Sequence, residues 1–154
     1  MGFQQPDDTR FMRRAIELAC RNPRAPFAAV IVRRKDGTVL AEGVNRAEQS
    51  PIWHGEVVAI DRCATAFPGA DWSGLCLYTT AEPCPMCQAA ILWAGIPRVV
   101  FGTSIGRLAE LGWQQIGLPA EEIARHWPFA SCEIRGGVLA PECDALFEAA
   151  MRMR

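Results

Sequence analysis

Short apolar runs typical of β-strands alternate with segments of helical periodicity along this chain, and that alternation limits the folds open to it. Such an order predicts an α/β protein with one sheet that helices cover on both faces. The predicted elements are, in order, a helix at about 8–20, strands at 27–32 and 38–44, a helix at 54–67, a strand at 75–80, a helix at 85–93, a strand at 98–102, one or two short helices within 103–130, a strand at 134–139 and a helix from Pro141.

The connections between the strands predict their directions. Lys35-Asp36-Gly37 is a hairpin turn signal, so the first two strands should be antiparallel neighbours. The later strands are separated by helices and should be parallel, with right-handed crossovers. The sequence therefore predicts a sheet with both antiparallel and parallel pairs.

The composition is that of an ordinary globular chain without an excess of either charge. Its 154 residues are half apolar, and 16 Lys and Arg face 17 Asp and Glu for a net charge of −1. The length predicts a single domain over 1–154, and the charge balance disfavours a general nucleic-acid binder. The first fifteen positions contain five charged residues where a signal peptide would need an apolar segment, and the longest nearly apolar run, Ala89–Ile96, is too short to span a membrane. We therefore expect a cytoplasmic protein without a membrane partner.

Seven cysteines in such a chain indicate metal binding, catalysis or burial rather than disulfides. Cys84 and Cys87 are three positions apart at the start of a predicted helix, so both thiolates can hold one ion. The motif alone leaves half of a zinc site, a redox pair and chance all open. The other five are interpreted as small buried hydrophobic residues: Cys20, Cys63, Cys76, Cys132 and Cys143.

His54 and Glu56 open another predicted helix. In the first turn, two side chains at this spacing can both reach a group beyond the helix end. One can then bind a metal ion while the other meets a water on that ion. Three protein ligands leave a fourth position open, as in catalytic zinc sites, and Glu56 would move protons there.

The His-x-Glu motif at 54–56 and the Pro-Cys-x-x-Cys motif at 83–87 match the signature of zinc nucleobase deaminases. On these residues the chain resembles the cytidine deaminase-like superfamily over about 9–151. The resemblance implies a three-layer α/β/α sandwich with a five-stranded mixed sheet.

The resemblance also implies a reaction and its residues. One Zn²⁺ per chain would be bound by His54, Cys84 and Cys87, and Glu56 would be the catalytic proton carrier. The reaction would hydrolyse a C–N bond of a cyclic amidine, converting an amino-substituted nucleobase or nucleoside to the oxo product with release of ammonia.

Within the superfamily, bacterial guanine deaminases are similar to this chain at Phe27, at Asn45 and from the cysteine motif to Trp93. That resemblance implies that Asn45 binds the edge of the base and that Phe27 and Trp93 form walls. Trp53 stands where the guanine and tRNA branches carry a small residue, and Gly55 stands where they usually carry alanine, so both are expected to shape the pocket. A guanine-type purine is the first candidate substrate.

Other branches match elsewhere, so other substrates stay open. Fungal cytosine deaminases share Gly55 and the stretch 95–98, whereas bacterial tRNA adenosine deaminases are similar over 137–154. The near-neutral charge disfavours tRNA as the partner. A structural-zinc or redox Cys-x-x-Cys domain is the alternative from a different class.

The segment 106–129 is expected to border the pocket and to decide the substrate. Its candidate contacts are Trp113, Gln114, Gln115, His126 and Trp127. Members of the superfamily usually form dimers through helices that follow the metal motif. The resemblance therefore implies a homodimer that acts on a small-molecule nucleobase or nucleoside.

Overall fold

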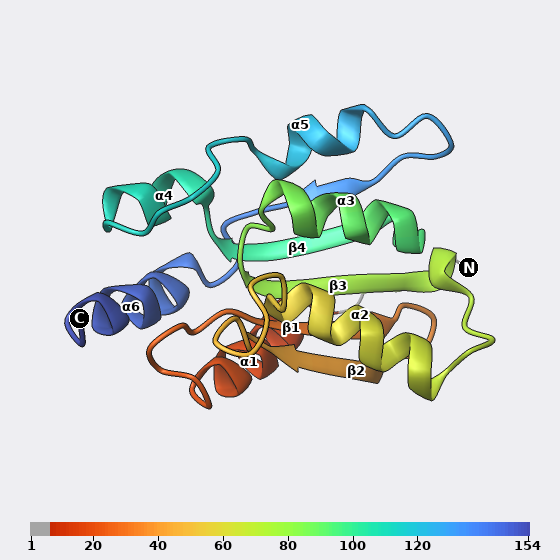
Figure 1. The fold of residues 1–154 in the computed structure, drawn as a ribbon. Helices are drawn as coiled ribbons and strands as arrows, with labels where there is room; N and C mark the ends of the chain where they lie inside the picture. The colour runs from red at the N-terminus through yellow and green to blue at the C-terminus, as the bar shows by residue number, and fades with distance from the viewer. Residues whose placement is uncertain (1–6) are drawn as a thin grey trace.

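The computed structural model describes residues 7–154, which form a five-stranded sheet with helices on both sides (Figure 1). The strands lie across the sheet in the order β2-β1-β3-β4-β5. Their bounds are β1 Ala28–Arg33, β2 Thr38–Val44, β3 Leu75–Ala81, β4 Arg98–Thr103 and β5 Glu133–Arg135. The helices are α1 Asp8–Ala19, α2 Gly55–Ala66, α3 Pro85–Ala94, α4 Ile105–Glu110, α5 Ala120–Arg125 and α6 Ala140–Met151, with a 3-10 turn at Trp72–Gly74.

The strand directions confirm the prediction of a mixed sheet. β1 is antiparallel to both of its neighbours, β2 and β3, while β3, β4 and β5 are mutually parallel. Every residue of β3 and β4 is buried, because helices cover both faces of these central strands. That burial explains why the two strands read as nearly continuous apolar runs.

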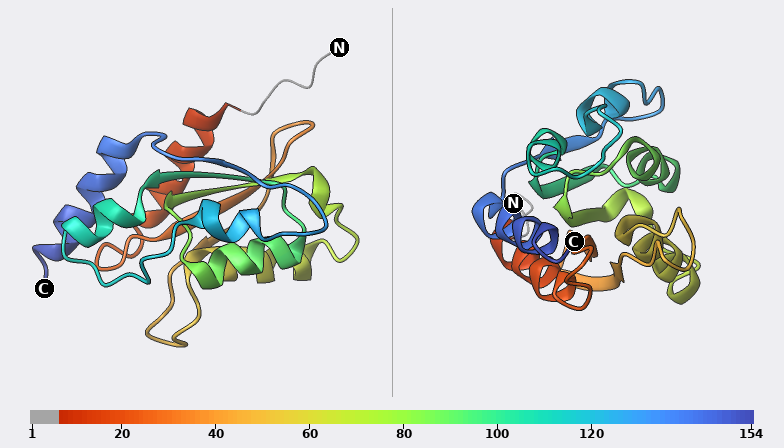
Figure 2. Two further views of the ribbon diagram at one scale, coloured as in Figure 1. Left: turned by 90° about the horizontal axis from the view of Figure 1, so that it is seen from above. Right: turned by 60° about the vertical axis from the view of Figure 1, so that its left-hand side comes forward.

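Two apolar layers separate the sheet from its helices (Figure 2). On one face, α1 and α6 lie over Val30, Val32 and their neighbours in the sheet. On the other face, α2 and α3 lie over Ala29, Ile31 and the residues beside them. Alternate residues of β1 thus point to opposite layers, as the pleat requires. The predicted three-layer α/β/α sandwich is confirmed.

A buried ion pair joins α1 to the sheet. The Asp7 side chain caps the start of α1, and Asp8 beside it is only 6% exposed. The Arg98 guanidinium donates to both oxygens of the Asp8 carboxylate at 2.8 Å, and the Tyr78 hydroxyl donates to it at 2.7 Å. Burial acts to raise the pKa of Asp8, but these hydrogen bonds outweigh it and lower the pKa to about 2.

Three expectations from the sequence need correction. The strand predicted at 134–139 covers only Glu133–Arg135, because Gly137 and Leu139 adopt left-handed backbone angles that end it before α6. Cys20 is exposed rather than buried, since it caps the end of α1 beyond the face that meets the sheet. Cys132 is only partly buried, on the loop that leads into β5.

The stretch 103–130, which was predicted to contain one or two short helices, contains α4 and α5. In the part of the chain that the structure describes, no helix is both long and apolar enough to cross a membrane.

Candidate active site

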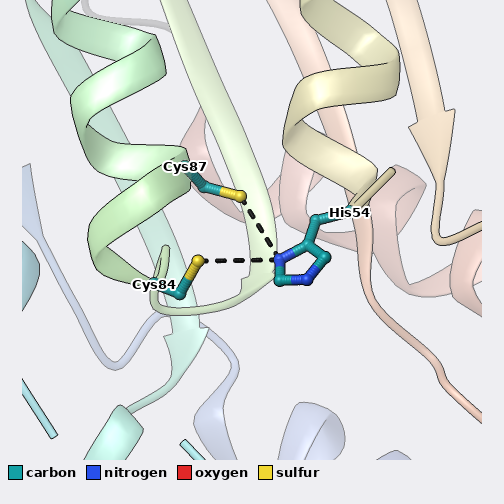
Figure 3. A group of neighbouring side chains, drawn as sticks. All are labelled: His54, Cys84 and Cys87. Carbon is teal, nitrogen blue, oxygen red and sulfur yellow. Dashed lines mark hydrogen bonds between the residues drawn. The ribbon is translucent and has the colours of Figure 1, made fainter. Parts of the chain in front are cut away.

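Three side chains that are far apart in the sequence meet between α2 and α3 (Figure 3). The His54 Nδ1 atom lies 3.6 Å from the Cys84 Sγ atom and 3.5 Å from the Cys87 Sγ atom. A tetrahedral zinc ion, with bonds of about 2.3 Å to sulfur and about 2.0 Å to nitrogen, separates such ligands by about 3.5 Å. The donor set and its spacing therefore fit a zinc ion with three protein ligands.

The starts of two helices position these donors. His54 is the N-cap residue of α2 and Cys84 is that of α3, and both have extended backbone angles. Pro85 occupies the first position of α3, where a missing N–H costs nothing. Cys87 lies one turn into α3 and is fully buried. Both helix starts thus face one point with their positive dipole ends, which favours thiolate ligands.

Two glycines allow α2 to begin close to the sheet. A Cβ atom on Gly43 would lie 2.3 Å from the Gly55 carbonyl oxygen and 2.5 Å from the Ala59 nitrogen. A Cβ atom on Gly55 would lie 2.9 Å from the Phe27 carbonyl oxygen. Gly55 therefore shapes the site by close backbone packing, which brings His54 and Glu56 up to the start of β1.

Glu56 is the buried carboxyl group of the site. It is 3% exposed, and its Oε1 atom accepts a hydrogen bond of 2.8 Å from the Thr79 hydroxyl. The same hydroxyl lies 2.9 Å from the Ala81 carbonyl oxygen. Burial raises the pKa of Glu56, while hydrogen bonds with Cys87 and Thr79 act against that rise. A carboxyl group with a raised pKa suits proton transfer near neutral pH.

The thiols and the imidazole share protons among themselves. The Cys84 thiolate accepts from the Cys87 thiol and, to a smaller extent, from His54, which lowers the pKa of Cys84 to about 4. The same bond between the two sulfurs, together with burial, raises the pKa of Cys87. Hydrogen bonding with Cys84 raises the pKa of His54. Metal binding requires thiolates and a neutral imidazole, so it would displace these protons.

A cavity of about 200 Å³ opens beside these groups. An aromatic cluster forms part of the cavity wall, with the Trp113 ring edge-on to the rings of Phe27 and Phe147. The Trp113 indole N–H also donates to the Phe147 carbonyl oxygen at 3.3 Å. The cavity is lined by Phe27, Asn45, His54, Glu56, Glu82, Cys84, Trp113, Gln114 and Gln115.

The structure brings some of the predicted substrate contacts together and leaves others apart. Asn45 and Phe27 line the cavity, whereas Trp53 and Trp93 do not. Trp53 is 37% exposed beneath the Arg46 guanidinium. Trp93 is 87% exposed on the outer face of α3.

In the segment 106–129, three of the five candidate contacts line the cavity: Trp113, Gln114 and Gln115. His126 is exposed and lies 3.5 Å from the Glu122 carboxylate. Neither it nor Trp127 lines the cavity.

Two further residues of the site, Thr79 and Glu82, are not predicted as contributors by the sequence pattern. Thr79 donates a hydrogen bond to the buried Glu56 carboxyl group, and its signal is a hydroxyl side chain in a largely apolar, fully buried strand. Glu82 lines the cavity next to the metal motif. Its role depends on contacts with residues much later in the chain, which no local pattern could reveal.

The chain belongs to the family described as the cytidine and deoxycytidylate deaminase zinc-binding region, whose model matches residues 5–103. It is thus a deaminase, a hydrolase of C–N bonds. This match confirms the superfamily inferred from the two motifs. It also favours a catalytic site over the structural-zinc or redox alternative.

Individual relatives are similar over most of the chain. Guanine deaminase of Bacillus subtilis is 40% identical over 124 residues, which cover 73% of this chain and 78% of that protein. A tRNA-specific adenosine deaminase of the same species is 31% identical over 148 residues, which cover 94% and 89%. The solved structure of guanine deaminase from Nitrosomonas europaea matches with a TM-score of 0.82 and 25% identity, covering 95% of this chain and 86% of that one.

Proposed function

We propose that residues 1–154 form one zinc-dependent deaminase domain that acts on a free nucleobase, with guanine as the first candidate. The observation that carries the proposal is the buried Glu56 carboxyl group, which lines the same small cavity as His54 and Cys84, two of the three grouped metal donors; the third, Cys87, is buried beside them. A cavity of about 200 Å³ is smaller than the roughly 300 Å³ at which pockets for drug-sized ligands begin, so it suits a single base. The 40% identity to the Bacillus subtilis guanine deaminase supports a purine.

Each part of the site has a role in this reaction. His54, Cys84 and Cys87 would hold the zinc ion, which when bound supplies a water nucleophile at neutral pH. Glu56 would take one proton from the attacking water and deliver it to a ring nitrogen, and would then take the proton of the newly formed hydroxyl group and pass it to the departing amine, which leaves as ammonia. Thr79 holds the Glu56 carboxylate through its hydroxyl group.

The remaining cavity residues orient the base. The Asn45 Oδ1 atom accepts a hydrogen bond from the Ala47 N–H, which leaves the Asn45 amide N–H groups to donate to an acceptor on the base edge. Phe27 and Trp113 border the ring with apolar surface. The predicted contributions of Trp53 and Trp93 would come from outside this cavity.

Metal analysis and a product assay test the proposal together. We expect about one zinc ion per chain and ammonia release from guanine in a screen that also contains cytosine, adenine and their nucleosides. Glu56→Ala should keep the zinc and lower the rate by about 10²–10⁴-fold. Glu142→Ala, an exposed control, should change neither. A zinc-free active protein, or full activity in Glu56→Ala, would refute the mechanism.

A tRNA adenosine deaminase is the second candidate, because such a relative matches 94% of this chain. It predicts inosine formation in an anticodon stem-loop and binding that weakens steeply with added salt. Absence of binding to that RNA at low salt would remove this candidate. Cytosine deamination, the third candidate, is decided by the same ammonia screen.

We also propose a cytoplasmic homodimer. A metal site with two thiolates needs reducing conditions, which supports the cytoplasm.

Trp93, a large apolar side chain on α3 that is 87% exposed, supports a second copy covering this helix face. Light scattering should give twice the chain mass, and Trp93→Glu should shift the protein towards the monomer. A wild-type monomer at micromolar concentration would contradict the dimer.

A further inference from the structure

The Glu82 carboxylate joins three separate parts of the chain. Glu82 follows the last residue of β3, two positions before Cys84, and it lines the cavity. Its Oε1 atom accepts a hydrogen bond of 2.9 Å from the Ile105 backbone N–H. Its Oε2 atom accepts one of 2.8 Å from the Ala120 backbone N–H. One side chain next to the metal motif therefore holds two points that are fifteen residues apart in sequence.

The two points are the first residues of α4 and α5. Between these helices runs an irregular segment, residues 111–119, that carries Trp113, Gln114 and Gln115 into the cavity wall. Much of this segment is exposed, including Ile116 at 66%. Trp113 is buried against Phe27 and Phe147, but the residues after it have few buried contacts, so their position depends strongly on how the segment is fixed at its two ends.

The backbone of Glu82 is itself fixed to the sheet. Its backbone N–H donates to the Thr103 carbonyl oxygen at 2.8 Å, at the ends of the paired strands β3 and β4. Both carboxylate oxygens are directed to backbone N–H groups, and hydrogen bonds to a charged acceptor are stronger than neutral ones. The Glu82 carboxylate thus lines the cavity, but both of its oxygens are used to hold the starts of α4 and α5.

We propose that Glu82 is a positioning residue for the substrate: it sets the distance between the metal motif and the cavity wall formed by Trp113, Gln114 and Gln115. The proposal rests on the proposed deaminase function where it concerns the substrate. In this role Glu82 neither transfers protons nor binds zinc. Its loss should loosen the wall and weaken binding of the base in the ground state and the transition state alike, which raises KM more than it lowers kcat.

Three variants separate this role from a general loss of structure. Glu82→Ala removes both acceptors, whereas Glu82→Gln keeps one acceptor and turns an N–H donor towards the other backbone N–H. Ala120→Pro removes one donor from the opposite side. Proline is favoured at the first residue of a helix, and the extended Pro119 before it accommodates that change. Glu110→Gln, an exposed substitution on α4, is the control.

Two measurements on the zinc-loaded protein test the positioning role of Glu82. Hydrogen exchange of the amides in 111–119 should rise at least tenfold in Glu82→Ala, and less in Glu82→Gln and Ala120→Pro, while exchange in α1 stays unchanged. KM for guanine should rise about tenfold or more in Glu82→Ala, with kcat within about threefold of wild type and zinc still near one per chain. Glu110→Gln should match wild type in both measurements.

Unchanged exchange in 111–119 for all three variants would overturn the proposal, and so would lost zinc or a fall in kcat without a rise in KM. The exchange measurement requires no substrate. If no base is deaminated and exchange still rises only in this segment, the proposed substrate fails while Glu82 keeps its role in positioning the wall.

Discussion

The Thr79 hydroxyl group offers the sharpest test of how the site works. Thr79 is fully buried in β3, and its hydroxyl donates to the Glu56 carboxylate at 2.8 Å. Thr79→Val replaces the hydroxyl by a methyl group of similar size, so the strand and its packing should survive. The substitution leaves the Glu56 carboxylate in the same buried place with one hydrogen-bond donor fewer.

The expected cost follows from that contact. A hydrogen bond to a charged group contributes about 1.5–3 kcal/mol when its partner is removed. Each 1.36 kcal/mol corresponds to a tenfold change in rate, so kcat should fall about 10–150-fold. KM should change little, because Thr79 does not line the cavity.

Steady-state ammonia release with the best base found in the screen measures this loss, alongside zinc content and thermal unfolding. Thr79→Ser is the matched control, since it keeps the hydroxyl and loses only a methyl group, at a stability cost of about 1 kcal/mol. It should retain kcat within about threefold. Wild-type kcat in Thr79→Val, or equal losses in both variants, would refute the argument.

Three further predictions concern packing, pH and the metal. Gly43→Ala should destabilise the fold by about 1–3 kcal/mol, seen as a lower melting temperature, because its Cβ atom would lie 2.3 Å from the Gly55 carbonyl oxygen. The lowered pKa of Asp8, about 2 against a usual 3.8, should contribute about 2 kcal/mol of stability. That contribution is complete above about pH 4 and is lost as the pH falls through about 2, which acid titration of the unfolding free energy measures. Removal of metal by a chelator should abolish deamination, and one equivalent of zinc should restore it.

Each of these has its own control. Gly69→Ala should be nearly neutral, since nothing lies within 4 Å of its Cβ position, and an equal loss there would contradict the packing argument. Asp8→Asn should flatten the stability curve between pH 4 and 2; an unchanged curve would show that another group titrates. Activity that survives complete removal of metal would exclude a metal-dependent reaction.

Local patterns predicted most of the elements because short-range physics governs them. The turn at Lys35–Gly37 gave the hairpin, and β-type runs alternating with helical periodicity gave the central strands. The prediction failed at 134–139, where an apolar pattern suggested a longer strand. Two residues in left-handed conformations, Gly137 and Leu139, end that strand, and a pattern of apolar residues does not encode such backbone angles.

The sequence by itself determined the class of this protein and its candidate site residues. The proposed zinc ligands and proton carrier are particular residue types at helix starts, so a linear pattern was enough to single out His54, Glu56, Cys84 and Cys87 as candidates. Only the tertiary structure decided what surrounds that chemistry. It placed Trp93 outside the cavity of its own chain and brought the Thr79 hydroxyl group within hydrogen-bond distance of Glu56. It also brought the backbone N–H groups of residues 105 and 120 to the Glu82 carboxylate. These contacts join residues that are distant in sequence, and long-range strand pairing and helix packing, rather than local preference, bring them together.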